Sequence, residues 1–185
     1  DTFLSLLNAT AGRTELDPLW LALVDRLHPL PVRWGQWTAW LAILQLAAHK
    51  AETLNQPARQ AEYLAYAADL LLNAGRLAPA LDTARQALAL ARRNGAAWPL
   101  AVAGNTASAT LRSLARYDEA QEIIDEIRAD LARMEQPRPA ARAAMVIALL
   151  DLEEMDLLRH FKRLDDALAL SESLIEQLSV VPGVD

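Results

Sequence analysis

The three histidines are the side chains in this sequence with the clearest scope for metal chemistry. His28, His49 and His160 stand far apart, and none of them falls in the His-Glu-x-x-His or Glu-x-x-His spacing of helical metal sites. Asp156 lies four residues before His160, so the two side chains would share one face of a helix. Two ligands are too few to hold a metal ion, and such a pair is usually a solvated helix contact. We expect no metal site.

The acidic pair Asp165-Asp166 is a second candidate, because neighbouring aspartates can bind diphosphates through metal ions. The residues that follow, Ala167-Leu168-Ala169, supply no further ligand. Acidic side chains in the first turn of a helix interact favourably with the positive end of its dipole. The pair is therefore better interpreted as the start of a helix.

Nucleotide and thiol chemistry are excluded by composition. The six glycines stand far apart, so no glycine cluster precedes a Lys to form a phosphate-binding loop. The chain has no Cys, which removes thiol nucleophiles, disulfides and thiolate zinc sites. We expect a protein that is not an enzyme and that needs no cofactor.

Composition favours helices throughout. The 185 residues include 37 Ala and 35 Leu against 7 Val and 6 Ile, a balance that suits helices and not pleated sheets. The formal charge is -6 with both signs mixed along the chain, so no basic patch predicts direct nucleic-acid binding.

The apolar run 38–48 is much shorter than the roughly 20 residues of a membrane span. The chain begins without Met, and we expect a fragment of a longer cytoplasmic protein.

A short signature recurs along the chain and organises this helical composition. It occurs at 75–80 (Gly-Arg-Leu-Ala-Pro-Ala), 115–120 (Ala-Arg-Tyr-Asp-Glu-Ala) and 162–167 (Lys-Arg-Leu-Asp-Asp-Ala). Residues 35–40 form a degenerate first copy that keeps the turn glycine. Apolar residues at spacings of three and four flank each copy, so each signature marks a turn between two amphipathic helices.

Individual residues of the signature have a steric interpretation. Gly75 can take the left-handed conformation that ends a helix, and Pro79 is tolerated because it lies in the first turn of the next one. The small residues Ala80, Ala120 and Ala167 would allow the two helices of a pair to cross closely.

We expect nine helices, separated by breakers at 55–57, 94–95 and 136–139. Asp17-Pro18 is interpreted as an N-cap followed by Pro at the first helical position. The expected helices cover 2–8, 17–28, 36–54, 58–74, 77–93, 97–115, 117–134, 139–160 and 164–179.

The signature resembles the tetratricopeptide repeat, in a variant of about 40 residues found in bacterial STAND-type signalling ATPases and large transcriptional regulators. Residues 34–134 match best, on Ala68, Leu71, Gly75, Leu77, Ala80, Ala87 and Leu88. The resemblance implies an all-α, right-handed superhelical stack of antiparallel hairpins with about 8–9 helices. It also implies one domain over 1–185, with N-terminal helices in 1–33 and a C-terminal repeat in 135–185.

In such families the repeats sense or dock a partner, usually in a concave groove formed by the first helix of each pair. The resemblance therefore implies a protein or peptide partner, and the alternative is a receptor for a signalling peptide or small ligand. A helical enzyme would need clustered inward-facing carboxylates or histidines, which the sequence lacks. The candidate groove residues are Asp69, Asn73, Asn105, Arg112, Asp156, Arg159 and His160. The remaining groove positions are Glu62, Ala65, Leu72, Val102, Ala109, Ser113, Leu149 and Leu152.

Large apolar side chains near the two ends of the array suggest further contacts. Trp34, Trp37 and Trp40 are spaced three apart, and we expect core positions for Trp37 and Trp40 and partial exposure for Trp34. A terminal repeat exposes an apolar face, so weak self-association is expected through the last helix. The residues of that face are expected to be Leu168, Leu174 and Leu178.

Overall fold

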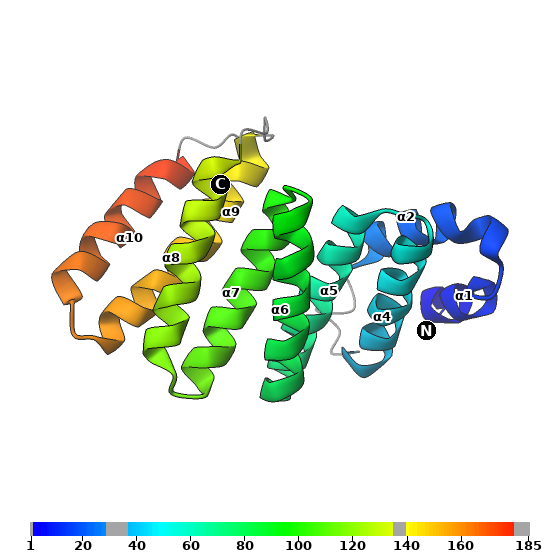
Figure 1. Ribbon diagram of the computed structural model, residues 1–185, viewed down its shortest axis with the longest axis horizontal. Helices are drawn as coiled ribbons and strands as arrows, with labels where there is room; N and C mark the ends of the chain where they lie inside the picture. The colour runs from blue at the N-terminus through cyan, green and yellow to red at the C-terminus, as the bar shows by residue number, and fades with distance from the viewer. Residues whose placement is uncertain (1, 29–36, 135–139, 180–185) are drawn as a thin grey trace.

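A computed structural model describes residues 2–28, 37–134 and 140–179. These residues form helices joined by short turns, with no strand among them, so the expected all-α class is confirmed (Figure 1). The helices are α1 (Thr2–Thr10), α2 (Asp17–Leu27), α4 (Trp37–Thr53), α5 (Pro57–Asn73), α6 (Leu77–Arg93), α7 (Ala97–Ser113), α8 (Tyr117–Arg133), α9 (Ala140–His160) and α10 (Leu164–Ser179). A short 3-10 turn, η1 (Thr14–Leu16), leads into α2.

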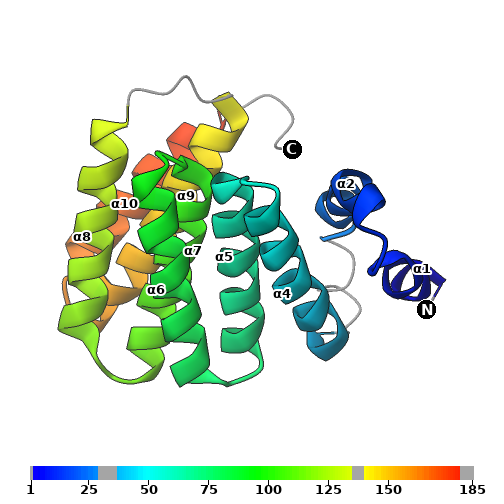
Figure 2. The same cartoon turned by 45° about the vertical axis from the view of Figure 1, so that its right-hand side comes forward.

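The five helices from α4 to α8 follow a strict period. Each has 17 residues and is separated from the next by three, so a new helix begins every 20 residues. Consecutive helices pack side by side along the stack (Figures 1 and 2). The 40-residue repeat of the sequence therefore corresponds to two equal helices with two equal connectors.

The connectors share one backbone conformation. Asn55, Gly75, Gly95, Ala115 and Lys162 all have positive φ, between 52° and 72°. In the connector after α5, the N–H of Gly75 donates to the carbonyl of Leu72 (2.8 Å) and the N–H of Arg76 donates to that of Leu71 (2.9 Å). This is the Schellman pattern, which satisfies the last carbonyls of the helix. The expectation for Gly75 is confirmed, and Ala115 and Lys162 adopt the same conformation without glycine.

Small residues lie where paired helices approach. Ala80 and Ala120 are fully buried and Ala167 is 6% exposed, as the signature predicts. They contribute to the contacts of α5 with α6, α7 with α8 and α9 with α10. Helices α7 and α8 also approach closely at Gly104. A Cβ atom added there would lie 1.8 Å from Cδ1 of Ile127.

Two apolar clusters form the core. The larger runs from α5 to α9 and includes Leu88, Leu111 and Ile124. The smaller joins α1, α2, α4 and α5 around Trp40, which is fully buried as predicted. Trp37 is partly buried against this cluster, while Trp34 and the breakers at 136–139 lie outside the described residues. No helix among the described residues is long and apolar enough to cross a membrane.

The expected N-cap role of Asp17 is wrong. The residue before α2 is Leu16, which makes no side-chain cap, and Asp17 lies in the first turn with its carboxylate accepting a hydrogen bond from Nζ of Lys50. Both side chains are buried between α2 and α4. A buried ammonium needs a carboxylate partner, whereas water can satisfy the exposed amides of a helix start.

Candidate functional site

Four of the seven predicted groove residues gather at the C-terminal ends of α7 and α9. Arg112 on α7 binds Asp156 on α9 (Nη1 to Oδ2, 3.1 Å), and Asp156 also accepts a hydrogen bond from Arg159 (3.4 Å). His160 is the next residue along α9. We call Arg112, Glu153, Asp156 and Arg159 the ion-pair chain.

Glu153 is the buried member of this chain, and the sequence did not single it out. It is 8% exposed and accepts two hydrogen bonds from Arg112, from Nε (3.1 Å) and Nη2 (3.3 Å). Burial raises the pKa of the Glu153 carboxyl, and the hydrogen bonds from Arg112 oppose this rise. The Arg112 guanidinium therefore pairs with two carboxylates of α9, those of Glu153 and Asp156. These ion pairs leave it less able to bind a ligand.

A second arginine holds α9 from the α8 side. Arg128 donates to both Asp151 and Glu154, and Asp151 is 1% exposed. The carboxylates of α9 thus alternate between two neighbours, since Asp151 and Glu154 meet α8 while Glu153 and Asp156 meet α7. No sequence motif marked Arg128 or Asp151, because the pairing joins residues in different hairpins.

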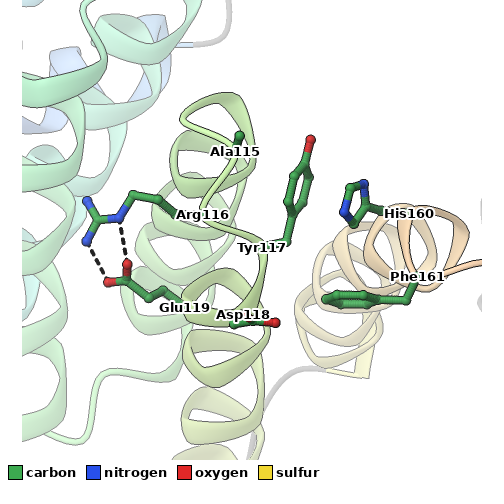
Figure 3. A pocket seen from close by; sticks show the side chains of 7 residues that line it. All are labelled: Ala115, Arg116, Tyr117, Asp118, Glu119, His160 and Phe161. Carbon is green, nitrogen blue, oxygen red and sulfur yellow. Dashed lines mark hydrogen bonds and ion pairs between the residues drawn. The ribbon is translucent and has the colours of Figure 1, made fainter.

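Next to the ion-pair chain lies an open pocket with aromatic walls, which we call the aromatic pocket. Tyr117 begins α8, His160 ends α9 and Phe161 follows in the turn (Figure 3). The rings of Tyr117 and His160 stack with centroids 3.4 Å apart and planes inclined by 12°. Phe161 meets His160 edge-on, with centroids 5.3 Å apart. The cavity measures about 280 Å³.

Charged side chains complete the rim of the aromatic pocket. Arg116 donates two hydrogen bonds of 2.6 Å to Glu119, and these hold the pKa of the Glu119 carboxyl below its ordinary value (Figure 3). Asp118 also lines the pocket and makes no ion pair with any residue that the structure describes. The rim therefore carries one carboxylate whose charge is not neutralised by an adjacent cation.

The other three predicted residues do not join this site. Asn73 donates from Nδ2 to the backbone carbonyl of Asp69 (2.9 Å), and burial raises the pKa of the Asp69 carboxyl. Asn105 is half-buried on α7. Ala65, expected along the same groove, is fully buried in the core cluster instead, because the small side chain lies where α5 packs on its neighbours.

The histidines occupy separate environments. His28 stacks on Tyr66 with centroids 3.8 Å apart and accepts a hydrogen bond at Nδ1 from Nε1 of Trp40 (3.0 Å). Burial lowers the pKa of His28 to about 4, so its imidazole is neutral near pH 7. The part of the chain that the structure describes contains no group of three or more metal-ligating side chains.

Comparison of the chain with protein-family models, with curated proteins and with solved structures found no match. The structure itself defines the class of protein: it is an all-helical protein built as a stack of antiparallel hairpins. The tetratricopeptide resemblance remains a prediction carried by the residues of the repeated signature.

Proposed function

We propose that this protein is a non-enzymatic scaffold for protein–protein interaction, and that it binds a peptide segment of its partner at the aromatic pocket. The observation that carries this proposal is the stack of Tyr117 on His160 beside Phe161, in a cavity open to solvent. Exposed aromatic rings beside charged groups are frequent in surfaces that bind proteins.

The size of the pocket favours a side chain over a whole small molecule. Its volume of about 280 Å³ lies at the lower limit of ligand pockets, which span roughly 300–1,000 Å³. A peptide side chain would fill it while the peptide backbone crosses the ends of α7 and α9. This supports peptide binding over the small-ligand alternative.

The walls of the pocket favour a cationic side chain. The Phe161 ring and the face of Tyr117 opposite His160 can attract a cation through their ring quadrupoles, and the Asp118 carboxylate on the rim adds negative charge. We therefore propose Lys or Arg as the anchoring residue of the peptide. The family resemblance supports a wider role, in which the scaffold is the sensor or partner-binding region of a larger cytoplasmic signalling protein in bacteria.

A random peptide library displayed on phage and selected on the immobilised protein tests this proposal. Selected peptides should share a Lys or Arg, and their affinity should fall at least about tenfold for Tyr117→Ala and for Phe161→Ala. Arg76→Ala is the matched control, because Arg76 occupies in the α5–α6 connector the position of Arg116, and the residue that follows it is Leu77 in place of Tyr117. Peptides that bind both pocket variants as tightly as the unchanged protein would contradict the proposal.

A further inference from the structure

Helix α10 has two apolar faces, and the described residues cover only one of them. Ala167 (6% exposed) and Leu174 (8%) pack toward α9. Leu164, Leu168 and Ile175 are 63%, 59% and 69% exposed, and their spacings of four and seven residues place them on one face. We call these three residues the α10 stripe. The expectation that Leu174 belongs to the exposed face is wrong, and the side chain of Leu178 lies outside the described residues.

The repeat shows what normally covers such a face. Leu77 follows the positive-φ Gly75 by two residues, as Leu164 follows Lys162, so α6 and α10 can be aligned residue by residue. Leu168 and Ile175 then correspond to Leu81 and Leu88 of α6, which are only 4% and 3% exposed. These two lie in the core cluster together with residues of α7.

The neighbours of the two helices explain the difference. Helix α6 packs between α5 and α7, whereas α10, the last helix that the structure describes, packs against α9 (Figure 1). The α10 stripe is thus the counterpart of a surface on which, in the preceding hairpins, another helix packs. Its geometry suits an added helix rather than an extended peptide, because its residues follow the spacing of helix-to-helix contacts.

The charge of α10 indicates which kind of helix could pack on the α10 stripe. Helix α10 contains Asp165, Asp166, Glu172 and Glu176 and no Lys or Arg. Asp165 and Glu172 stand seven residues apart, so they form an acidic flank beside the α10 stripe. Asp166 pairs with Arg163 (2.7 Å) and lies outside this flank. Two copies of α10 brought together would place like-charged flanks against each other, which disfavours self-association through this helix.

We propose that the α10 stripe docks an amphipathic helix of a partner protein, with apolar residues facing Leu164, Leu168 and Ile175 and with Lys or Arg facing the acidic flank. None of these three residues lines the aromatic pocket, so the two interactions can be tested independently. The docked helix would extend the stack by packing on α10 as α7 packs on α6.

Two synthetic helices test this inference. Both are about 18 residues long, enough to form a helix alone, and carry Leu along one face; one has Lys beside that face and the other has Glu at the same positions. Fluorescence anisotropy should show that the Lys peptide binds the intact chain and that the Glu peptide binds at least about tenfold more weakly. Raising the ionic strength to about 0.5 M should reduce this difference, because exposed charges are then screened.

Variants of the protein locate the binding surface. Leu168→Ser and Ile175→Ser should each weaken binding of the Lys peptide about tenfold or more, without loss of helical circular dichroism, since both side chains are exposed. Leu19→Ser is the matched control, because Leu19 on α2 is also 69% exposed and lies at the other end of the stack. Tyr117→Ala should leave this binding unchanged.

Three results would overturn the proposal. Equal affinity for the Lys and Glu peptides would show that the acidic flank does not contribute to binding. Unchanged binding by Leu168→Ser and Ile175→Ser would place the helix elsewhere. Light scattering that shows a dimer of the unchanged chain, lost in Ile175→Ser, would identify a second copy as the occupant.

Discussion

Arg112 and Glu153 form a two-pronged ion pair between α7 and α9, with N···O distances of 3.1 and 3.3 Å. The pair joins the α7–α8 hairpin to the α9–α10 hairpin, next to the aromatic pocket. On the other side of α9, Arg128 bridges Asp151 and Glu154. The α9–α10 hairpin is therefore positioned by ion pairs as well as by the apolar residues Leu150 and Leu157 of α9.

Replacing Arg112 by Leu should lower the free energy of unfolding by about 2 kcal/mol. The change leaves the buried Glu153 carboxylate without its cation, and the partial exposure of Arg112 reduces the loss below that of a fully buried pair. Urea denaturation at pH 7 measures this change in the free energy of unfolding. The double variant with Glu153→Leu should recover most of the loss, since no buried charge then remains unpaired. A single variant as stable as the unchanged protein would contradict this assignment.

Replacing Ala115 by Gly should stabilise the protein by about 1 kcal/mol. Ala115 has φ of 58°, a conformation that costs an L-residue roughly 1–2 kcal/mol and glycine much less. Lys162→Gly should act in the same direction. The control is Ala89→Gly on the exposed side of α6, which should instead destabilise by about 0.5–1 kcal/mol. Thermal unfolding of the three variants tests the signs, and a destabilising Ala115→Gly would rule out the left-handed turn.

Gly104→Ala should destabilise the protein by about 1–3 kcal/mol despite the higher helix propensity of Ala. The new methyl group would overlap Cδ1 of Ile127, which is fully buried on α8. Combining the change with Ile127→Val removes that atom, so the double variant should lose less stability than the sum of the single variants. Additive losses in a double-mutant cycle would show that α7 and α8 do not approach closely at Gly104.

His28 should make the protein less stable as the pH falls from about 6.5 to about 4. Burial lowers the pKa of the folded imidazole to about 4, whereas the unfolded His28 takes up its proton near pH 6.5. Between these two pH values the unfolded state binds more protons than the folded state. The contribution of the neutral His28 to stability, up to about 3 kcal/mol, is therefore present above pH 6.5 and lost as the pH falls toward 4.

His28→Asn tests that dependence on pH. Asn does not titrate, and its side-chain carbonyl can accept the hydrogen bond that Trp40 donates to His28. The stability difference between pH 7 and pH 4.5, measured by urea denaturation, should be smaller for the variant. An identical difference in both proteins would mean that His28 titrates normally in the folded state.

Most of the helices could be predicted from the sequence because their period is so regular. The apolar spacing around Gly75 and the breakers at Asn55 and Gly95 placed helix ends within a residue or two of those observed. On α10, however, spacing alone did not separate Leu174 from Ile175. Neighbours on an amphipathic helix differ by about 100°, and only the packing against α9 decides which side chain is covered.

The candidate site was predicted only in part, for a related reason. Positions on one helix are related by its period, so Arg112, Asp156 and His160 could be assigned to the first helices of their pairs. Their partners Glu153 and Tyr117 meet them across hairpins that are distant in sequence. Such contacts depend on how the hairpins stack, which no local pattern encodes.

The most direct test of the proposed scaffold role is amide hydrogen exchange of the protein with and without a library-selected peptide. We predict slower exchange of the backbone in 115–119 and 159–163, the two segments around the aromatic pocket, with little change in α4 and α5. Protection confined to α4–α6, with none at the ends of α7 and α9, would contradict peptide binding at the Tyr117–His160 stack.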